Sequence, residues 1–221
     1  MNSQSNKIKV WDFPTRFFHW AMVLLLVSLW WTAENGEMQW HQVCAYLLMV
    51  LVVFRLVWGF LGSETSLFKQ FLVSPKRVVQ YTLQQPKPNS IGHNPLGGYM
   101  VVLLLTLIIL QLGTGLFATD DVFTEGPLMY LVSSDTASWL TWLHKNNFNL
   151  IIAMSAVHIL AVAVHLLKGE NLIKAMFSGY KNMQASIVAP KLCSPLLALI
   201  IIAIIFSLVW FYLLAPVVSF L

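Results

Sequence analysis

Charged residues are scarce in this chain. Asp, Glu, Lys and Arg make up 10% of its 221 residues, whereas hydrophobic residues make up 58%. Because a soluble domain needs a charged surface, this composition excludes an ordinary soluble protein and predicts an integral membrane protein. The net charge of +4 does not indicate nucleic-acid binding, because the basic residues follow membrane sidedness.

Cysteine is also rare, and the two cysteines are Cys44 and Cys193. No Cys-x-x-Cys-His motif is present, so covalently attached haem is excluded, and no cysteine cluster is available for an iron–sulfur centre. We expect no disulfide, because the charge pattern puts the two cysteines near opposite membrane faces.

Five apolar segments are long enough to cross a bilayer, and none contains Asp or Glu. They are residues 17–33, 43–61, 96–118, 148–167 and 195–214. All should be helices, because lipid offers an open backbone no other hydrogen-bond partner. The first segment carries His19 and ends without a small-residue cleavage site, so we interpret it as a retained span and not as a signal peptide.

Basic and acidic residues alternate between the connections of these spans. Residues 1–16, 62–95 and 168–192 hold eleven of the thirteen Lys and Arg residues, including Lys87, whereas the other two connections hold one cation, Lys145. The positive-inside rule therefore predicts a cytoplasmic N-terminus and, after five spans, a periplasmic C-terminus. The acidic residues of the two outer connections are Glu34, Glu37, Asp120, Asp121, Glu125 and Asp135.

Two connections carry helix signals of their own. On the cytoplasmic side, Ser74 and Pro75 predict the N-cap and first position of a short basic amphipathic helix on the membrane surface. On the outer side, Asp135 is a candidate N-cap for a helix that runs through His144 into the fourth span.

Three of the six histidines lie between residues 143 and 168. His144 and His158 are fourteen residues apart, which is almost four helical turns, so both imidazoles point from nearly the same face, about 21 Å apart along the axis. A histidine inside a span is costly unless it is paired or bound, so such residues are candidate ligands. For either one alone, an interhelical hydrogen bond is an equally good interpretation.

Depth in the membrane pairs these histidines with two others. His41 begins the second span and should lie level with His144 near the outer face, whereas His19 begins the first span and should lie level with His158 near the inner face. Two neutral imidazoles from different helices suit the two axial positions of a haem iron. A zinc site needs four close ligands and each level offers two, so we expect two stacked haems.

Other residues are candidates for contacts around a haem. Arg16, one turn before His19, and Arg55, on nearly the same face as His41, are candidate partners of haem propionates, although Arg16 also suits a membrane anchor. His165 is a candidate substitute ligand to the inner haem, a candidate contact of a propionate or quinone, or a histidine at the membrane interface. His93 is expected either to have a structural role or to lie at the mouth of a quinone pocket. The glycines at positions 59, 97, 98, 113 and 115 suit either porphyrin contact or tight helix packing.

Four motifs together resemble the bacterial cytochrome b561 family, which is related to the b-type cytochrome subunit of nickel–iron hydrogenases. They are VWDFPTRFFHW from residue 10, WHQVCAYLLMVLVVFRLVWGF from residue 40, GHNPLGGYM from residue 92 and LHKNNFNLIIAMSAVHILAVAVHLLKGENL from residue 143. The resemblance implies an all-α membrane protein with a four-helix bundle that holds two b haems. It also implies His19, His41, His144 and His158 as the ligands, in agreement with the depth argument.

The resemblance covers about residues 8–175, so we expect a di-haem domain at 1–175 and a cytoplasmic linker with an extra fifth helix at 176–221. It implies electron transfer in the bacterial inner membrane between the quinone pool and a periplasmic partner, such as a c-type cytochrome or a hydrogenase. Whether the protein is itself an enzyme stays open. The alternatives are a stand-alone quinone oxidoreductase that uses superoxide or another small donor, and a histidine-lined transporter without haem; homo-oligomerisation also stays open.

Overall fold

Five long apolar helices form most of the molecule. The computed structural model describes residues 5–84, 90–120, 124–184 and 186–219, so Lys87 and Asp121 lie outside the described residues. Among the described residues, five helices are long and apolar enough to cross a membrane, which confirms the all-α membrane fold. They are α1 (Phe13–Glu34), α2 (Met38–Leu61), α5 (Pro95–Gly115), α6 (Ser134–Leu167) and the C-terminal helix Pro195–Val218. The last comprises α8 (Pro195–Val209), the π-helical turn η3 (Trp210–Leu214) and α9 (Ala215–Val218).

The helix ends differ from those of the apolar segments that predicted them, because capping residues and not hydropathy set the ends: α6 begins fourteen residues before its segment, whereas α5 ends three residues short of its own. Asp12 caps α1 by accepting a 2.7 Å hydrogen bond from the Thr15 amide. The expected N-cap of α6, Asp135, is wrong: Ser133 caps this helix by accepting from the Thr136 amide, and Asp135 lies in the first turn. A serine oxygen and a carboxylate are about equally good caps, so sequence alone could not choose between them.

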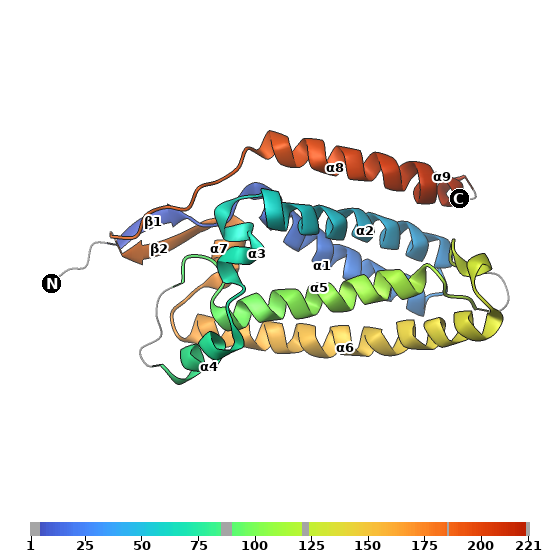
Figure 1. Ribbon diagram of the computed structural model, residues 1–221, viewed down its shortest axis with the longest axis horizontal. Helices are drawn as coiled ribbons and strands as arrows, with labels where there is room; N and C mark the ends of the chain where they lie inside the picture. The colour runs from blue at the N-terminus through green and yellow to red at the C-terminus, as the bar shows by residue number, and fades with distance from the viewer. Residues whose placement is uncertain (1–4, 85–89, 121–123, 185, 220–221) are drawn as a thin grey trace.

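Helix α2 is central to the bundle. Half of its apolar window is buried, against 6–17% in the other four helices. It packs on α1 and on α8, while α5 packs on α6, and in Figure 1 α8 runs along α2 at the edge of the molecule. One core cluster joins residues from four of the five helices: Phe18, Leu51, Phe54, Trp58, Leu105 and Ala198.

A two-stranded antiparallel sheet, which sequence analysis missed, closes one end of the bundle. Strand β1 (Ser5–Lys9) pairs with β2 (Tyr180–Gln184), which follows the short helix α7 (Leu172–Ser178). Gly179, at φ 85°, accepts hydrogen bonds from the amides of Val10 and Trp11. The start of the chain and the segment after the fourth span therefore meet at one end, while α9 lies at the other (Figure 1).

The same end holds the remaining short elements. These are η1 (Glu64–Ser66), α3 (Phe68–Phe71) and α4 (Pro75–Leu83), with Ser74 and Pro75 in their predicted places before and at the start of α4. The opposite end carries the short turn η2 (Met129–Leu131). Cys44 and Cys193 are both free, as predicted.

Candidate functional site

The level that the charge pattern predicts to be the outer one, called the outer level below, is built around His41 and His144. In His41, Nδ1 lies 3.0 Å from the Leu29 carbonyl oxygen and 3.3 Å from Thr32 Oγ1. A carbonyl oxygen can only accept, so Nδ1 carries the hydrogen and Nε2 keeps its lone pair. This is the tautomer that a metal-ligating histidine adopts when its other nitrogen is held by the backbone.

His144 is held in the same way by α5. Its Nδ1 lies 2.9 Å from the Gln111 carbonyl oxygen and 3.2 Å from Thr114 Oγ1, so its Nε2 is also free. A Cβ on Gly115 would come within 3.0 Å of the His144 ring, so this glycine makes room for the imidazole.

The two imidazoles, one from α2 and one from α6, lie close together in an edge contact. Their ring centroids are 6.4 Å apart. A metal–imidazole bond of about 2.0 Å, plus about 1.1 Å from nitrogen to ring centre, places the centroids of two opposite imidazole ligands about 6.2 Å apart. The described residues contain no group of three or more His, Cys, Asp or Glu side chains that could hold a metal, and this level brings two imidazoles together.

The inner level contains His19 from α1 and His158 from α6. The two side chains are close enough to interact electrostatically. His19 Nδ1 is buried and has no hydrogen-bond partner among the described residues, and its ring packs edge-on against Trp20 at 4.9 Å. Unlike the outer pair, this level therefore leaves a buried imidazole nitrogen unsatisfied.

Arg55 lies in α2 toward the inner end and is almost fully buried, with 3% of its surface exposed. Its guanidinium stacks over the Phe68 ring at 4.9 Å, and Nη1 has no hydrogen-bond partner among the described residues. Asp12 is the nearby carboxylate, but its oxygens accept from the Thr15 amide and from Trp58 Nε1. A buried cation without an ion pair is costly, so the site suits an additional anionic group.

Arg16 is engaged by the protein itself. Its Nη1 donates to the Phe177 carbonyl and its Nε donates to the Asp12 carbonyl at 3.3 Å. These bonds tie the first turn of α1 to the end of α7. Of the two arginines singled out from sequence, Arg55 is therefore the one with a buried nitrogen that has no hydrogen-bond partner among the described residues.

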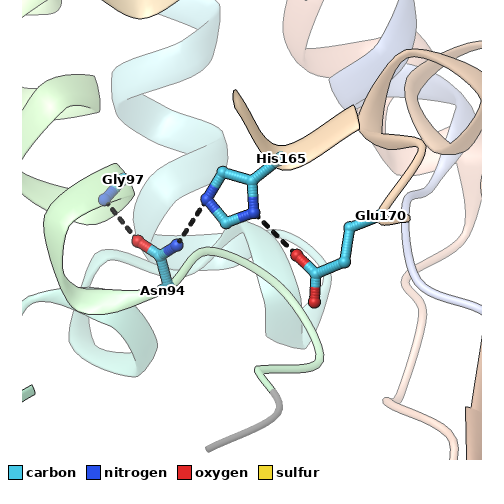
Figure 2. Close-up of polar contacts among 4 residues, drawn as sticks. All are labelled: Asn94, Gly97, His165 and Glu170. Carbon is cyan, nitrogen blue, oxygen red and sulfur yellow. Dashed lines mark hydrogen bonds and ion pairs between the residues drawn. The ribbon is translucent and has the colours of Figure 1, made fainter. Parts of the chain in front are cut away.

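His165 lies at the C-terminal end of α6, and Figure 2 shows protein partners on both sides of its ring. Its Nδ1 is 2.7 Å from Glu170 Oε2, and its Nε2 faces Asn94 Nδ2 at 3.5 Å. Asn94 in turn accepts from the Gly97 amide at 2.7 Å as the N-cap of α5. The imidazole therefore connects the N-cap of α5 to the residues that follow α6.

His93 lies immediately before α5, with its ring packed between Trp11 and Phe71 at centroid distances of 4.8 and 4.9 Å. Its Nδ1 is buried without a partner among the described residues. Burial, together with the charges of Arg55 and Lys181, lowers the pKa of His93 to about 3. This imidazole is therefore neutral at physiological pH.

The predicted glycines have different surroundings. A Cβ on Gly59 would overlap the Phe68 ring and one on Gly98 would overlap the Phe71 backbone, so both serve tight packing. Gly97 sits in the capped turn of Asn94, and Gly113 has open space at its Cβ position. Sequence analysis missed Thr32, Thr114 and the carbonyls that hold the histidines, since a threonine in an apolar helix gives no specific signal.

The five long apolar helices define a multi-pass membrane protein, and the histidines at its two levels are candidate haem ligands. A family model described as prokaryotic cytochrome b561 matches residues 10–179, so the chain belongs to the prokaryotic cytochrome b561 family. Comparison with curated proteins and with solved structures gives no significant match. Strand β2, the linker after it and the C-terminal helix lie beyond the matched region.

Proposed function

We propose that this protein is a di-haem conduit that passes electrons between the quinone pool and an outer-face partner, such as a c-type cytochrome or a hydrogenase. His41 and His144 ligate the outer haem, and His19 and His158 ligate the inner haem. The protein lies in a bacterial inner membrane with its N-terminus in the cytoplasm and its C-terminus in the periplasm. The haem-binding domain spans residues 1–175, and residues 176–221 add the linker and fifth helix.

The geometry of His41 and His144 is the main observation that supports this proposal. A centroid separation of 6.4 Å matches two axial imidazoles, and backbone carbonyls orient both rings so that Nε2 is free. These contacts fix both imidazoles before any cofactor binds, which reduces the conformational entropy that the two side chains lose on binding. The bound haem supplies the one-electron iron couple, and the surrounding apolar side chains exclude water.

At the inner level, the unsatisfied groups support the second haem. His19 Nδ1 and Arg55 Nη1 are both buried without partners among the described residues. Arg55 supplies a positive charge for a haem propionate, while His165 and Arg16 position helix ends. Because Arg55 adds positive charge near this haem, it favours the reduced iron.

Two alternatives differ from the conduit in testable ways. A stand-alone oxidoreductase would turn over superoxide or another small donor without a partner protein, and it uses the same haem sites. The transporter without haem loses its support, because membership of a b-type cytochrome family implies haem binding.

The proposal is tested by purifying the protein in detergent and recording its reduced-minus-oxidised visible spectrum together with haem and protein concentrations. We expect low-spin b-type bands and two haems per chain. A reproducible ratio of one haem per chain, from cells grown with ample haem precursor, would contradict the two-level arrangement. Turnover of superoxide with quinone by the isolated protein would favour the stand-alone oxidoreductase.

Replacing Arg55 with Gln should lower the reduction potential of the inner haem, because the oxidised iron is no longer disfavoured by a buried positive charge. We expect a shift of about 60 mV or more, equivalent to a factor of ten for a one-electron couple. Potentiometric titration of both haems measures it. Arg77→Gln, on the amphipathic helix α4, is the matched control and should leave both potentials unchanged.

A further inference from the structure

The two imidazoles of the outer level are held by the same pattern of groups on two different helices. In each case Nδ1 lies next to a main-chain carbonyl and next to the hydroxyl of a threonine three residues later. The pairs are Leu29 and Thr32 on α1 for His41, and Gln111 and Thr114 on α5 for His144. The two halves of the outer level therefore orient their imidazoles in equivalent ways.

The two halves differ in the side chain of the residue that supplies the carbonyl. Leu29 has an apolar side chain, whereas Gln111 has an amide that contacts α6. Its partner there is Asn147, three residues after His144, and Asn147 Nδ2 donates to Gln111 Oε1 at 2.7 Å. The same residue of α5 thus holds His144 by its main chain and Asn147 by its side chain.

The contacts of Asn147 determine which way its amide points. Its Nδ2 also donates to the Leu107 carbonyl at 2.9 Å, one turn before Gln111. Because a main-chain carbonyl can only accept, the nitrogen and not the oxygen of Asn147 faces α5, and the Gln111 atom that it meets is an oxygen. Asn147 therefore ties α6 to two successive turns of α5, beside the contact that orients His144.

The burial of Asn147 makes its amide costly. Only 1% of the residue is exposed, and its Oδ1 is buried without a hydrogen-bond partner among the described residues. A leucine of similar size would avoid the cost of an unpaired acceptor. Polar groups inside a membrane bundle are candidates for a functional role. For Asn147, the half of the amide that makes contacts is Nδ2, and these contacts lie next to a candidate haem ligand.

We propose that Asn147 is a positioning residue for the outer haem site, which acts through Gln111 on His144. Its hydrogen bonds hold the turn of α5 at which the Gln111 carbonyl accepts from His144 Nδ1. A well-held bond from Nδ1 to a carbonyl makes the imidazole a more basic ligand, and a more basic ligand stabilises oxidised iron. Asn147 therefore lowers the reduction potential of the outer haem. This inference rests on the proposed function, because it takes His144 as an axial ligand.

Asn147→Leu removes the amide and keeps a side chain of similar size. Full-length haem-loaded protein is titrated potentiometrically, and the outer haem is identified as the one absent from His144→Ala. We expect the ratio of reduced to oxidised outer haem at a given potential to rise about threefold, which corresponds to about 28 mV for a one-electron couple. The inner haem should keep its potential. The EPR signal of the oxidised outer haem should also shift, because the g values of low-spin ferric haem depend on the orientation of the axial imidazole planes.

A second variant removes the same hydrogen bond from the other helix. Gln111→Leu keeps the main-chain carbonyl that holds His144 and gives α5 the residue type that α1 has at Leu29. It should shift the outer haem as Asn147→Leu does, and the double variant should shift it no further, because the two amides act as one unit. Asn146→Leu is the matched control, since this neighbouring asparagine is exposed and donates within α6, to the carbonyl four residues earlier, at 2.8 Å. It should leave both potentials unchanged.

The outcomes distinguish this proposal from the proposed function. Wild-type protein without haem contradicts the proposed function. Two haems with an unchanged outer potential in both variants would overturn the role of Asn147 and leave the ligands unaffected, as would an equal shift in Asn146→Leu or a shift of the inner haem instead. Loss of the outer haem alone in Asn147→Leu supports positioning of His144, whereas loss of both haems in both variants indicates a purely structural tie and overturns the proposal. If Asn147→Leu does not fold, Gln111→Leu decides.

Discussion

We expect His144→Ala to hold one haem per chain instead of two. The imidazole is one of only two candidate ligands at the outer level, and its partner His41 is 6.4 Å away by ring centroid. An alanine leaves that iron with one axial imidazole and a cavity beside Gly115, so the outer haem is lost while the inner haem keeps both ligands. The haem-to-protein ratio and the reduced spectrum measure the change.

Replacing the second candidate ligand, His41, tests whether it binds the same haem as His144. His41→Ala should remove the same haem, and the double variant should hold as much haem as either single variant, because the two residues act as one unit. His165→Gln is the control, since both ring nitrogens already have protein partners, and it should keep two haems. Loss of different haems in His41→Ala and His144→Ala would contradict the pairing.

We expect His158→Ala to lose the inner haem and to keep the outer one. The reduced spectrum of His158→Ala should show the bands of the outer haem, which are absent from His144→Ala. The sum of the two variant spectra should therefore reproduce the wild-type bands. Duroquinol should no longer reduce the remaining haem in His158→Ala, because the electron entry point is gone, whereas dithionite still reduces it. The measurement is haem content combined with reduction by each donor.

His19→Ala provides the corresponding test on α1 and should match His158→Ala in haem content and in its response to duroquinol. Rapid duroquinol reduction of the outer haem in both variants would contradict entry at the inner level. Retention of two haems in both would contradict His19 and His158 as ligands. Arg77→Gln again provides a control, because Arg77 lies on α4, outside the long helices of the bundle.

Sequence patterns predicted the spans because their signals are local. An apolar run long enough for a bilayer must form a helix whatever surrounds it, and the five long apolar helices confirm this. The same helix geometry placed His144 and His158 on one face, and depth alone paired His41 with His144, which the structure brings together. The family match agrees with the motifs that carry the resemblance.

Features built from distant segments escaped sequence analysis. The strands Ser5–Lys9 and Tyr180–Gln184 are short and polar, and each is a strand because the other pairs with it. The choice of Ser133 over Asp135 as the cap of α6 depends on where the preceding turn ends.

The sequence by itself thus determined the membrane class, the five spans and the two levels of histidines, since hydropathy and helical period act along the chain. Only the tertiary structure decided which partners each of these side chains has. It gave His41 and His144 their carbonyl partners, engaged Arg16, left Arg55 Nη1 without a partner among the described residues, and set residues 188–190 against the turn of His93. These contacts join residues far apart in sequence, so no local pattern encodes them.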